Sequence, residues 1–211
     1  RSSAQVTILD DEPASAASIS FIDYGVYGVW SYDVVARFAK ITSDDPQQVV
    51  GSTNRNAYLD LGARGLWSWD SLRGLRQLTD ADPQQVVVIN DFWTRSEDVV
   101  LADFGTAGLW RYSDSRDWTR ITTGDAHAIV LDDQTAYIDF GPGGLWRWSD
   151  ETPWLKLNDT APEGMAADAG ALFLDYGPSG VWRWSTADGW RRLGTGDPQA
   201  IAVVGDVLFT D

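Results

Sequence analysis

The sequence has no cysteine, a single histidine (His127), and only six glutamate or lysine residues among its 211. The lack of cysteine excludes disulfides and thiolate metal sites. Glutamate and lysine are good helix formers, so their scarcity argues against a helical protein. No apolar run approaches the roughly 18 residues that a membrane-spanning helix needs. A Ser-His-Asp triad or a histidine-rich metal site would have to use this single histidine, so we do not expect the protein to be an enzyme.

The charge is one-sided, with 31 acidic against 16 basic residues and a formal net charge of −15. This balance argues against binding to nucleic acid or to anionic lipid. Aspartate dominates the acids and arginine dominates the bases, while the chain holds 12 Trp, 20 Gly and 8 Pro. Strands favour Trp and turns favour Gly, Asp and Pro, so the composition is typical of many short strands joined by tight turns.

A repeat runs through the chain. The motif Asp-aromatic-Gly-x-x-Gly-(Leu/Val)-Trp occurs at residues 23–30, 103–110, 139–146 and 175–182, and in a variant with Leu61 at residues 60–67. The repeats are marked by Asp23, Asp60, Asp103, Asp139 and Asp175. The spacing is 36 to 43 residues, and Asp211 stands in phase as the start of a truncated sixth motif.

Each repeat contains four β-like segments. In the copy around Asp139 they are residues 126–131, 135–139, 145–149 and 154–157, separated by Asp, Gly and Pro turns. Four strands in about 40 residues match one blade of a β-propeller, in which each blade is a four-stranded sheet. The sequence therefore predicts an all-β fold, a single β-propeller domain over residues 1–211.

The number of blades stays open. Residues 6–11 resemble residues 128–133, so we expect five complete four-stranded repeats plus an N-terminal half repeat. The ring then has five blades with a spare hairpin, or six blades whose last is completed by further sequence or by a partner chain.

Residues that recur in every repeat are interpreted as architecture. Large aromatics such as the motif tryptophans can fill the space between twisted sheets. The motif Asp precedes a glycine turn and can accept its backbone N–H groups. We expect no cofactor and no dedicated metal site; the alternative is a cation held by these turn carboxylates.

Binding is better supported than catalysis, because similar side chains recur in successive repeats and weak sites can sum to high avidity. The later repeats carry an Arg inside the Trp strand and a second Trp in the strand that follows. The candidate ligand residues are Arg111, Trp118, Arg147, Trp154, Arg183 and Trp190. Aromatic faces stack on sugar rings, so we expect multivalent carbohydrate recognition without catalysis.

This Trp-rich repeat of about 40 residues resembles the small propeller lectins, namely the tachylectin-2-like and fungal-type lectins of five or six blades. The resemblance covers nearly the whole chain at the level of repeat layout. It implies sugar sites on or between blades and a secreted or cell-surface location. No individual site residue is carried over from it.

One interval is longer than the others, and its extra residues fall at 90–98, with Trp93 and Arg95 as candidate ligand residues. A loop that no other repeat shares is a frequent carrier of function. The alternative function is therefore a protein-interaction or assembly module of a larger extracellular chain, and a hydrolase is less favoured. The expected partner is a carbohydrate or another protein.

Overall fold

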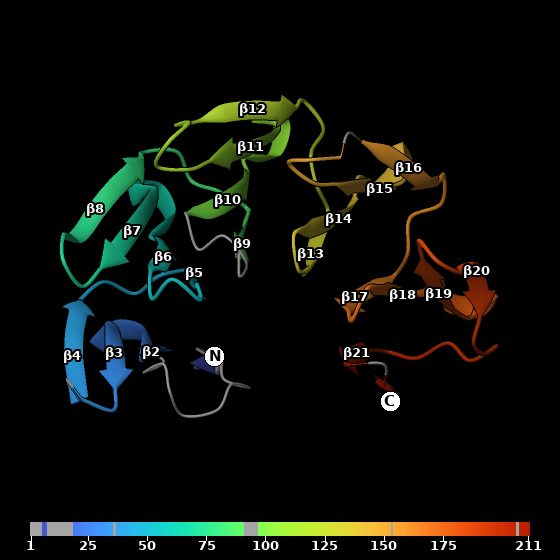
Figure 1. Ribbon diagram of the computed structural model, residues 1–211, viewed down its shortest axis with the longest axis horizontal. Coiled ribbons are helices and arrows are strands. Elements are labelled where there is room, and N and C mark those ends of the chain that lie inside the picture. Colours follow the sequence, from blue (N-terminus) through green and yellow to red (C-terminus); the bar gives the residue numbers. More distant parts are fainter. Residues whose placement is uncertain (1–5, 8–18, 36, 91–96, 153, 206) are drawn as a thin grey trace. The chain divides into compact units, whose positions relative to one another are not determined.

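A computed structural model describes residues 6–7, 19–35, 37–90, 97–152, 154–205 and 207–211. The described chain is all-β, and its helical segments are single 3-10 turns at the glycine motifs (Figure 1). These turns are η1 (Gly25–Tyr27), η2 (Gly62–Arg64), η3 (Gly105–Ala107), η4 (Gly141–Gly143) and η5 (Gly177–Ser179). The predicted all-β class is confirmed.

The strands form five antiparallel sheets of four strands each, in which neighbours in sequence are neighbours in the sheet. The first sheet holds β1 (Val6–Thr7), β2 (Ile19–Asp23), β3 (Val29–Asp33) and β4 (Arg37–Thr42). The second holds β5 (Gln48–Gly51), β6 (Ala57–Asp60), β7 (Leu66–Asp70) and β8 (Gly74–Thr79). The third holds β9 (Gln85–Asn90), β10 (Asp98–Asp103), β11 (Leu109–Tyr112) and β12 (Thr119–Thr122).

The fourth sheet holds β13 (Ala128–Asp132), β14 (Thr135–Asp139), β15 (Leu145–Trp148) and β16 (Leu155–Asn158). The fifth holds β17 (Gly164–Asp168), β18 (Ala171–Asp175), β19 (Val181–Ser185) and β20 (Gly189–Arg192). A sixth sheet has two strands, β21 (Ile201–Val204) and β22 (Val207–Thr210). Five four-stranded repeats are confirmed.

The half repeat is C-terminal rather than N-terminal, which corrects the sequence-based assignment. Strand β1 pairs with β2, which continues through β3 to β4, so the N-terminal hairpin belongs to a complete sheet. The two-stranded remainder is β21–β22. The physical reason is local pairing: each apolar hairpin joins the Trp strand that follows it, across the short glycine turn.

The chain forms two compact units. Unit 1 comprises Arg1–Phe104 and Trp110–Arg120, and unit 2 comprises Gly105–Leu109 and Ile121–Asp211. Within unit 1, β5 contacts both β2 and β9, and within unit 2, β17 contacts both β13 and β21. The core of each unit lies between neighbouring sheets: Tyr58, Val86 and Val100 pack together in unit 1, and Tyr137, Leu172 and Trp184 in unit 2.

The motif Asp caps the glycine turn, as its place before that turn predicts. One carboxylate oxygen accepts the backbone N–H of the first motif glycine at 2.7–2.9 Å in four repeats, namely at Asp23, Asp60, Asp139 and Asp175. Asp60, Asp139 and Asp175 are buried. Burial raises the pKa of Asp60 and Asp139, although the glycine N–H favours the charged form and opposes the shift.

Replacing Asp139 tests this cap. Asp139→Ala is expected to lower the free energy of unfolding by about 1–3 kcal/mol, because the buried N–H of Gly141 loses its acceptor. Asp139→Asn keeps an acceptor oxygen and removes a buried charge, so the loss at pH 7 is expected to be smaller. Urea unfolding measures both, and equal losses in the two variants would contradict the capping role.

The carboxyl group of Asp139 also predicts that the free energy of unfolding depends on pH. Burial raises the folded-state pKa of Asp139 above its unfolded value of about 4, against the lowering effects of Gly141 and His127. The group therefore contributes stability that is fully present below about pH 4 and lost as the pH rises through the folded pKa. Wild type should gain stability relative to Asp139→Asn when the pH falls from 7 to 4.

Candidate functional site

Each motif tryptophan has a cation of its own chain over its ring. Lys40 lies 5.7 Å from the ring centroid of Trp30, and Lys156 lies 5.5 Å from that of Trp146. Arginine does the same in the other repeats, with Arg64 over Trp67, Arg120 over Trp110 and Arg192 over Trp182 at 5.8–6.0 Å. One face of each motif tryptophan is thus used by a cation–π contact, which favours the architectural interpretation.

The second tryptophan of a repeat packs on the face opposite to its Arg. Trp190 stands directly across from Trp184, whereas Arg183 stands across from Arg191. Successive side chains of a strand point to opposite faces. Trp118 contacts Tyr112, and Trp154 contacts Trp146 and Trp148, which are the neighbours of the repeat's Arg in each case. Among the described residues, none of these three repeats therefore brings its Arg and its second Trp into one site.

Two of the three candidate arginines have hydrogen-bonding partners, and the third lies across from a tyrosine. Arg111 is buried and donates to Ser113 Oγ at 3.2 Å. Arg183 forms an ion pair with Asp188 at 3.0 Å. Arg147 lies across from Tyr137, where burial raises the pKa of the tyrosine to about 12, reinforced by Asp132 and opposed by the Arg147 charge. Trp93 and Arg95 lie outside the described residues.

Of the sequence-predicted residues, Trp190 lies in a pocket. The pocket belongs to unit 2 and has a volume of about 520 Å³. It is lined by residues of the fourth and fifth sheets and of the segment between them. Its aromatic wall is Tyr176, Trp182 and Trp190, with ring centroids 6.4 Å apart for Tyr176–Trp190 and 6.5 Å for Trp182–Trp190. Its other polar side chains come from Asn158, Thr160, Glu163 and Ser179.

Asn158 and Tyr176 are held in place by hydrogen bonds. The side-chain amide of Asn158 donates to the Tyr176 hydroxyl at 2.8 Å, and its oxygen accepts the Thr160 N–H at 3.1 Å. Burial raises the pKa of Tyr176, so the hydroxyl stays protonated near neutral pH. The pocket is therefore built from fixed amide and hydroxyl groups beside aromatic rings.

Trp190 differs from its counterpart in the third sheet. Trp118 is half-buried, and its indole N–H donates to the Leu78 carbonyl at 3.0 Å. Trp190 is 37% exposed, and within the described part of the chain no acceptor lies in hydrogen-bonding distance of its indole N–H. The Trp190 ring thus offers both an open surface and a donor to a ligand.

Glu163 also belongs to a group of carboxylates. Within the described residues, Glu163, Asp175 and Asp197 place one carboxylate oxygen each within 4.8 Å of one another. Hard cations such as Ca²⁺ prefer oxygen ligands and take about six to eight of them, so these groups would supply part of such a shell. Only Asp175 of the three is a motif Asp, so this group differs from a ring of motif carboxylates, and a cation at the motif carboxylates stays a prediction.

Sequence reasoning missed Asn158, Tyr176 and Glu163. A signal was present for Glu163, because the same turn position holds Gln47, Gln84, His127 and Gln199 in the other repeats. Its backbone N–H donates to the Asp175 carbonyl at 2.7 Å, as those of Gln47, Gln84 and His127 do to their own motif Asp. The backbone hydrogen bond at this turn position is the same in these repeats, and only the type of side chain differs.

Comparison with known proteins identifies the fold. No protein-family model and no curated protein matches the chain. PorZ, described as an essential bacterial surface component of the type-IX secretion system of Porphyromonas gingivalis, matches with a TM-score of 0.58 and 12% identity. The match covers 90% of this chain and 28% of PorZ, so this chain spans well under half of the PorZ chain.

Two further structures match over most of this chain. A chain of a nidogen/laminin complex has a TM-score of 0.56 and 14% identity, covering 91% of this chain and 84% of that one. The computationally designed Ika8 protein has a TM-score of 0.57 and 9% identity, covering 93% and 66%. These similarities show a propeller-like fold alone. Separately, none of the described helices has the length and apolar character required to cross a membrane.

Proposed function

We propose that this protein is a non-catalytic carbohydrate-binding module and that its ligand site is the pocket of Tyr176, Trp182 and Trp190. The observation that carries the proposal is the exposed ring of Trp190 beside fixed polar groups. Sugars present apolar C–H faces that stack on aromatic rings, and hydroxyls that need donors and acceptors. A pocket of about 520 Å³ has room for a short oligosaccharide or a monosaccharide.

The roles of the groups follow from their positions. Trp190 would stack on the sugar ring and donate its indole N–H to a hydroxyl. Glu163, which is exposed, would accept hydrogen bonds from sugar hydroxyls. The Tyr176 hydroxyl, fixed by Asn158, would do either. We also propose a secreted or cell-surface location; the fold likeness to PorZ, a bacterial surface component, supports it.

A glycan array followed by calorimetric titration of the best sugar tests this function. We expect Trp190→Ala to weaken binding by about tenfold or more, because stacking and the N–H donor are both lost. Trp190→Phe should retain part of the affinity. Leu72→Ala is the matched control, since Leu72 is 95% exposed and lies in unit 1.

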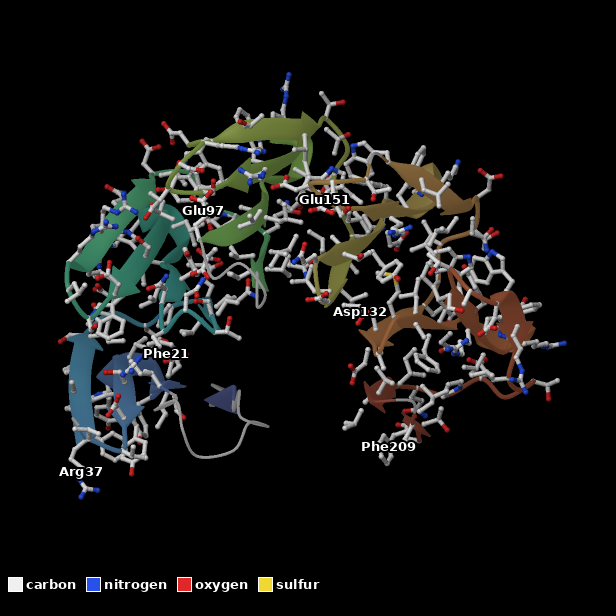
Figure 2. The ribbon with its side chains drawn as sticks, viewed as in Figure 1. Phe21, Arg37, Glu97, Asp132, Glu151 and Phe209 are labelled. Carbon is white, nitrogen blue, oxygen red and sulfur yellow. The ribbon has the colours of Figure 1, made fainter. Side chains whose placement is uncertain are left out.

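The number of sugars bound per chain distinguishes a single site in this pocket from the multivalent binding that the sequence predicts. One sugar bound per chain would support a single site in this pocket, whereas three equivalent sites would support binding by the repeated tryptophans. The absence of binding to any sugar of a broad array would overturn the proposal of carbohydrate binding. The alternative, a protein-interaction module, would then gain support from self-association in light scattering. Its structural basis is the exposed Val204, Val207 and Phe209 of the two-stranded sheet (Figure 2 labels Phe209).

A further inference from the structure

A second pocket, in unit 1, has a volume of about 580 Å³ and different chemistry. Its lining is polar: Asn54, Asn56, Tyr58, Asp98, Asp114 and Ser115, together with Glu97, which precedes β10 (Figure 2). Glu97 and Asp98 end the long interval that interrupts the repeat spacing. Asp98 lies five residues before its motif Asp. The same position holds Arg55, Gln134 and Gly170 in the second, fourth and fifth repeats. The blade architecture therefore does not require this carboxylate.

Asp98 is a buried carboxylate, 4% exposed, held by neutral donors. Its Oδ1 accepts the side-chain amide of Asn54 at 2.7 Å. Its Oδ2 accepts the amide of Asn56 at 2.8 Å and the hydroxyl of Tyr58 at 2.9 Å. Among the residues that the structure describes, no Arg, Lys or His forms an ion pair with it.

Of the neighbouring carboxylates of the pocket, Asp114 forms ion pairs and Glu97 is held by a neutral residue. Asp114 accepts from Arg76 at 2.7 Å and from Arg73 at 3.2 Å. Glu97 accepts the backbone N–H and the hydroxyl of Ser115.

The charge of the buried Arg111 also acts on Glu97. Burial raises the pKa of Glu97, but the hydrogen bonds from Ser115 and Ser113 together with Arg111 outweigh burial and hold it below its usual range. Among the described residues, the carboxylate of this pocket that is left without a compensating cation is that of Asp98. Buried charges in proteins are normally paired, so the pocket is complementary to a positive group.

The free acceptor positions specify the shape of that positive group. A carboxylate oxygen accepts about two hydrogen bonds, so Oδ2 is filled and Oδ1 has one position left. A guanidinium binds a carboxylate best through two parallel bonds, one to each oxygen, which Asp98 cannot accept. A primary ammonium is a compact charge whose N–H groups can use a single oxygen and adjacent acceptors. A quaternary ammonium has no N–H and is recognised by aromatic cages, which this polar lining does not provide.

We propose that this pocket binds a primary ammonium group carried by a polar ligand, with Asp98 as its counter-ion. Glu97 and Ser115 supply further acceptors at the rim. The ammonium has two sources with this chemistry, an amino sugar or a lysine side chain of a peptide. The pocket is separate from the proposed sugar site, since all its lining residues belong to unit 1 and those of the sugar site to unit 2.

Calorimetry at low salt and pH 7 tests the proposal with two probe pairs. Glucosamine is compared with N-acetylglucosamine, and the peptide acetyl-Gly-Lys-Gly-amide with its Nε-acetylated form. We expect at least one charged probe to bind about tenfold or more tightly than its neutral partner, because only it neutralises Asp98. The pair that responds identifies the source. Acetyl-Gly-Arg-Gly-amide should bind more weakly than the lysine peptide.

Variants separate the pocket from the sugar site. Asp98→Asn should lose about tenfold or more of the affinity for the charged probe and leave the neutral one unchanged. Glu97→Gln should lose severalfold of the affinity for the charged probe. The position is half-buried, and the one amide oxygen of glutamine can still accept the Ser115 backbone N–H, so this variant tests the pocket if Asp98→Asn fails to fold. Trp190→Ala should leave binding of the lysine peptide unchanged, because this peptide carries no sugar ring and Trp190 does not line this pocket. Equal binding of charged and neutral probes, or no binding of either charged probe at about 10 mM, would overturn the proposal.

Discussion

Replacing Trp118 with alanine is expected to lower the free energy of unfolding by about 3–5 kcal/mol, the range typical of truncating a packed aromatic residue. Trp118 packs against the core cluster of unit 1 and contacts the rings of Tyr112 at 5.1 Å and Phe104 at 5.7 Å. Its indole N–H bonds the Leu78 carbonyl of the preceding sheet. The variant would therefore lose a ring, leave a cavity and leave that carbonyl without its donor.

Trp190→Ala is the matched control for this loss, because Trp190 occupies the corresponding strand of the fifth sheet. Its ring is 37% exposed, so we expect its removal to cost less than half as much, on the order of 1–2 kcal/mol. Urea unfolding followed by tryptophan fluorescence and by circular dichroism measures both variants. Equal losses would show that the two tryptophans are structurally equivalent, and would weaken the assignment of Trp190 to ligand binding.

Gly65→Ala is expected to be nearly as damaging, with a loss of about 3 kcal/mol or more. Gly65 has a φ of +78°, in the left-handed region that disfavours side chains. A Cβ at this position would overlap the Thr79 carbonyl oxygen and lie 2.7 Å from the Cα of Asp80. Both obstacles are backbone atoms at the end of β8, so the turn and the outer strand would have to separate.

Gly189→Ala separates the two causes of that loss. Gly189 has a φ of +68°, but a Cβ there meets nothing within 4 Å. This control should pay only the conformational penalty of about 1–2 kcal/mol. Thermal unfolding of the two variants checks the difference, and a loss at Gly65 no larger than that at Gly189 would contradict the close approach of the glycine turn to β8.

The repeated features were predictable because they are local. Asp139 precedes a glycine turn in sequence, so its carboxylate can reach the Gly141 N–H in any fold that makes this turn. Alternation along residues 145–148 places Trp146 and Trp148 on one face, as the strand β15 confirms. The excess of arginine over lysine is not explained by stacking, because the two lysines, Lys40 and Lys156, stack on motif tryptophans as the arginines do.

The candidate sites were only partly predictable. Trp190 was selected for its place in the repeat, together with Trp118 and Trp154, and no pattern distinguishes it from them. The difference lies in what each ring meets in the adjoining sheet: Trp118 finds the Leu78 carbonyl and a closed core, and Trp190 retains an exposed surface. Arg183 and Trp190 do not share a site, because they lie on opposite faces of the sheet.

The sequence by itself determined the all-β class, the four-stranded repeat, the glycine turns and the residues that cap them. Each of these depends on neighbours within one hairpin, whose pattern recurs every 36 to 43 residues. Only the tertiary structure decided where Asp98 meets Asn54 and Tyr58, about 40 positions away, and where Tyr176 meets Asn158. The reason is that side chains of adjacent sheets are brought together by sheet packing, which leaves no periodic signature in the chain.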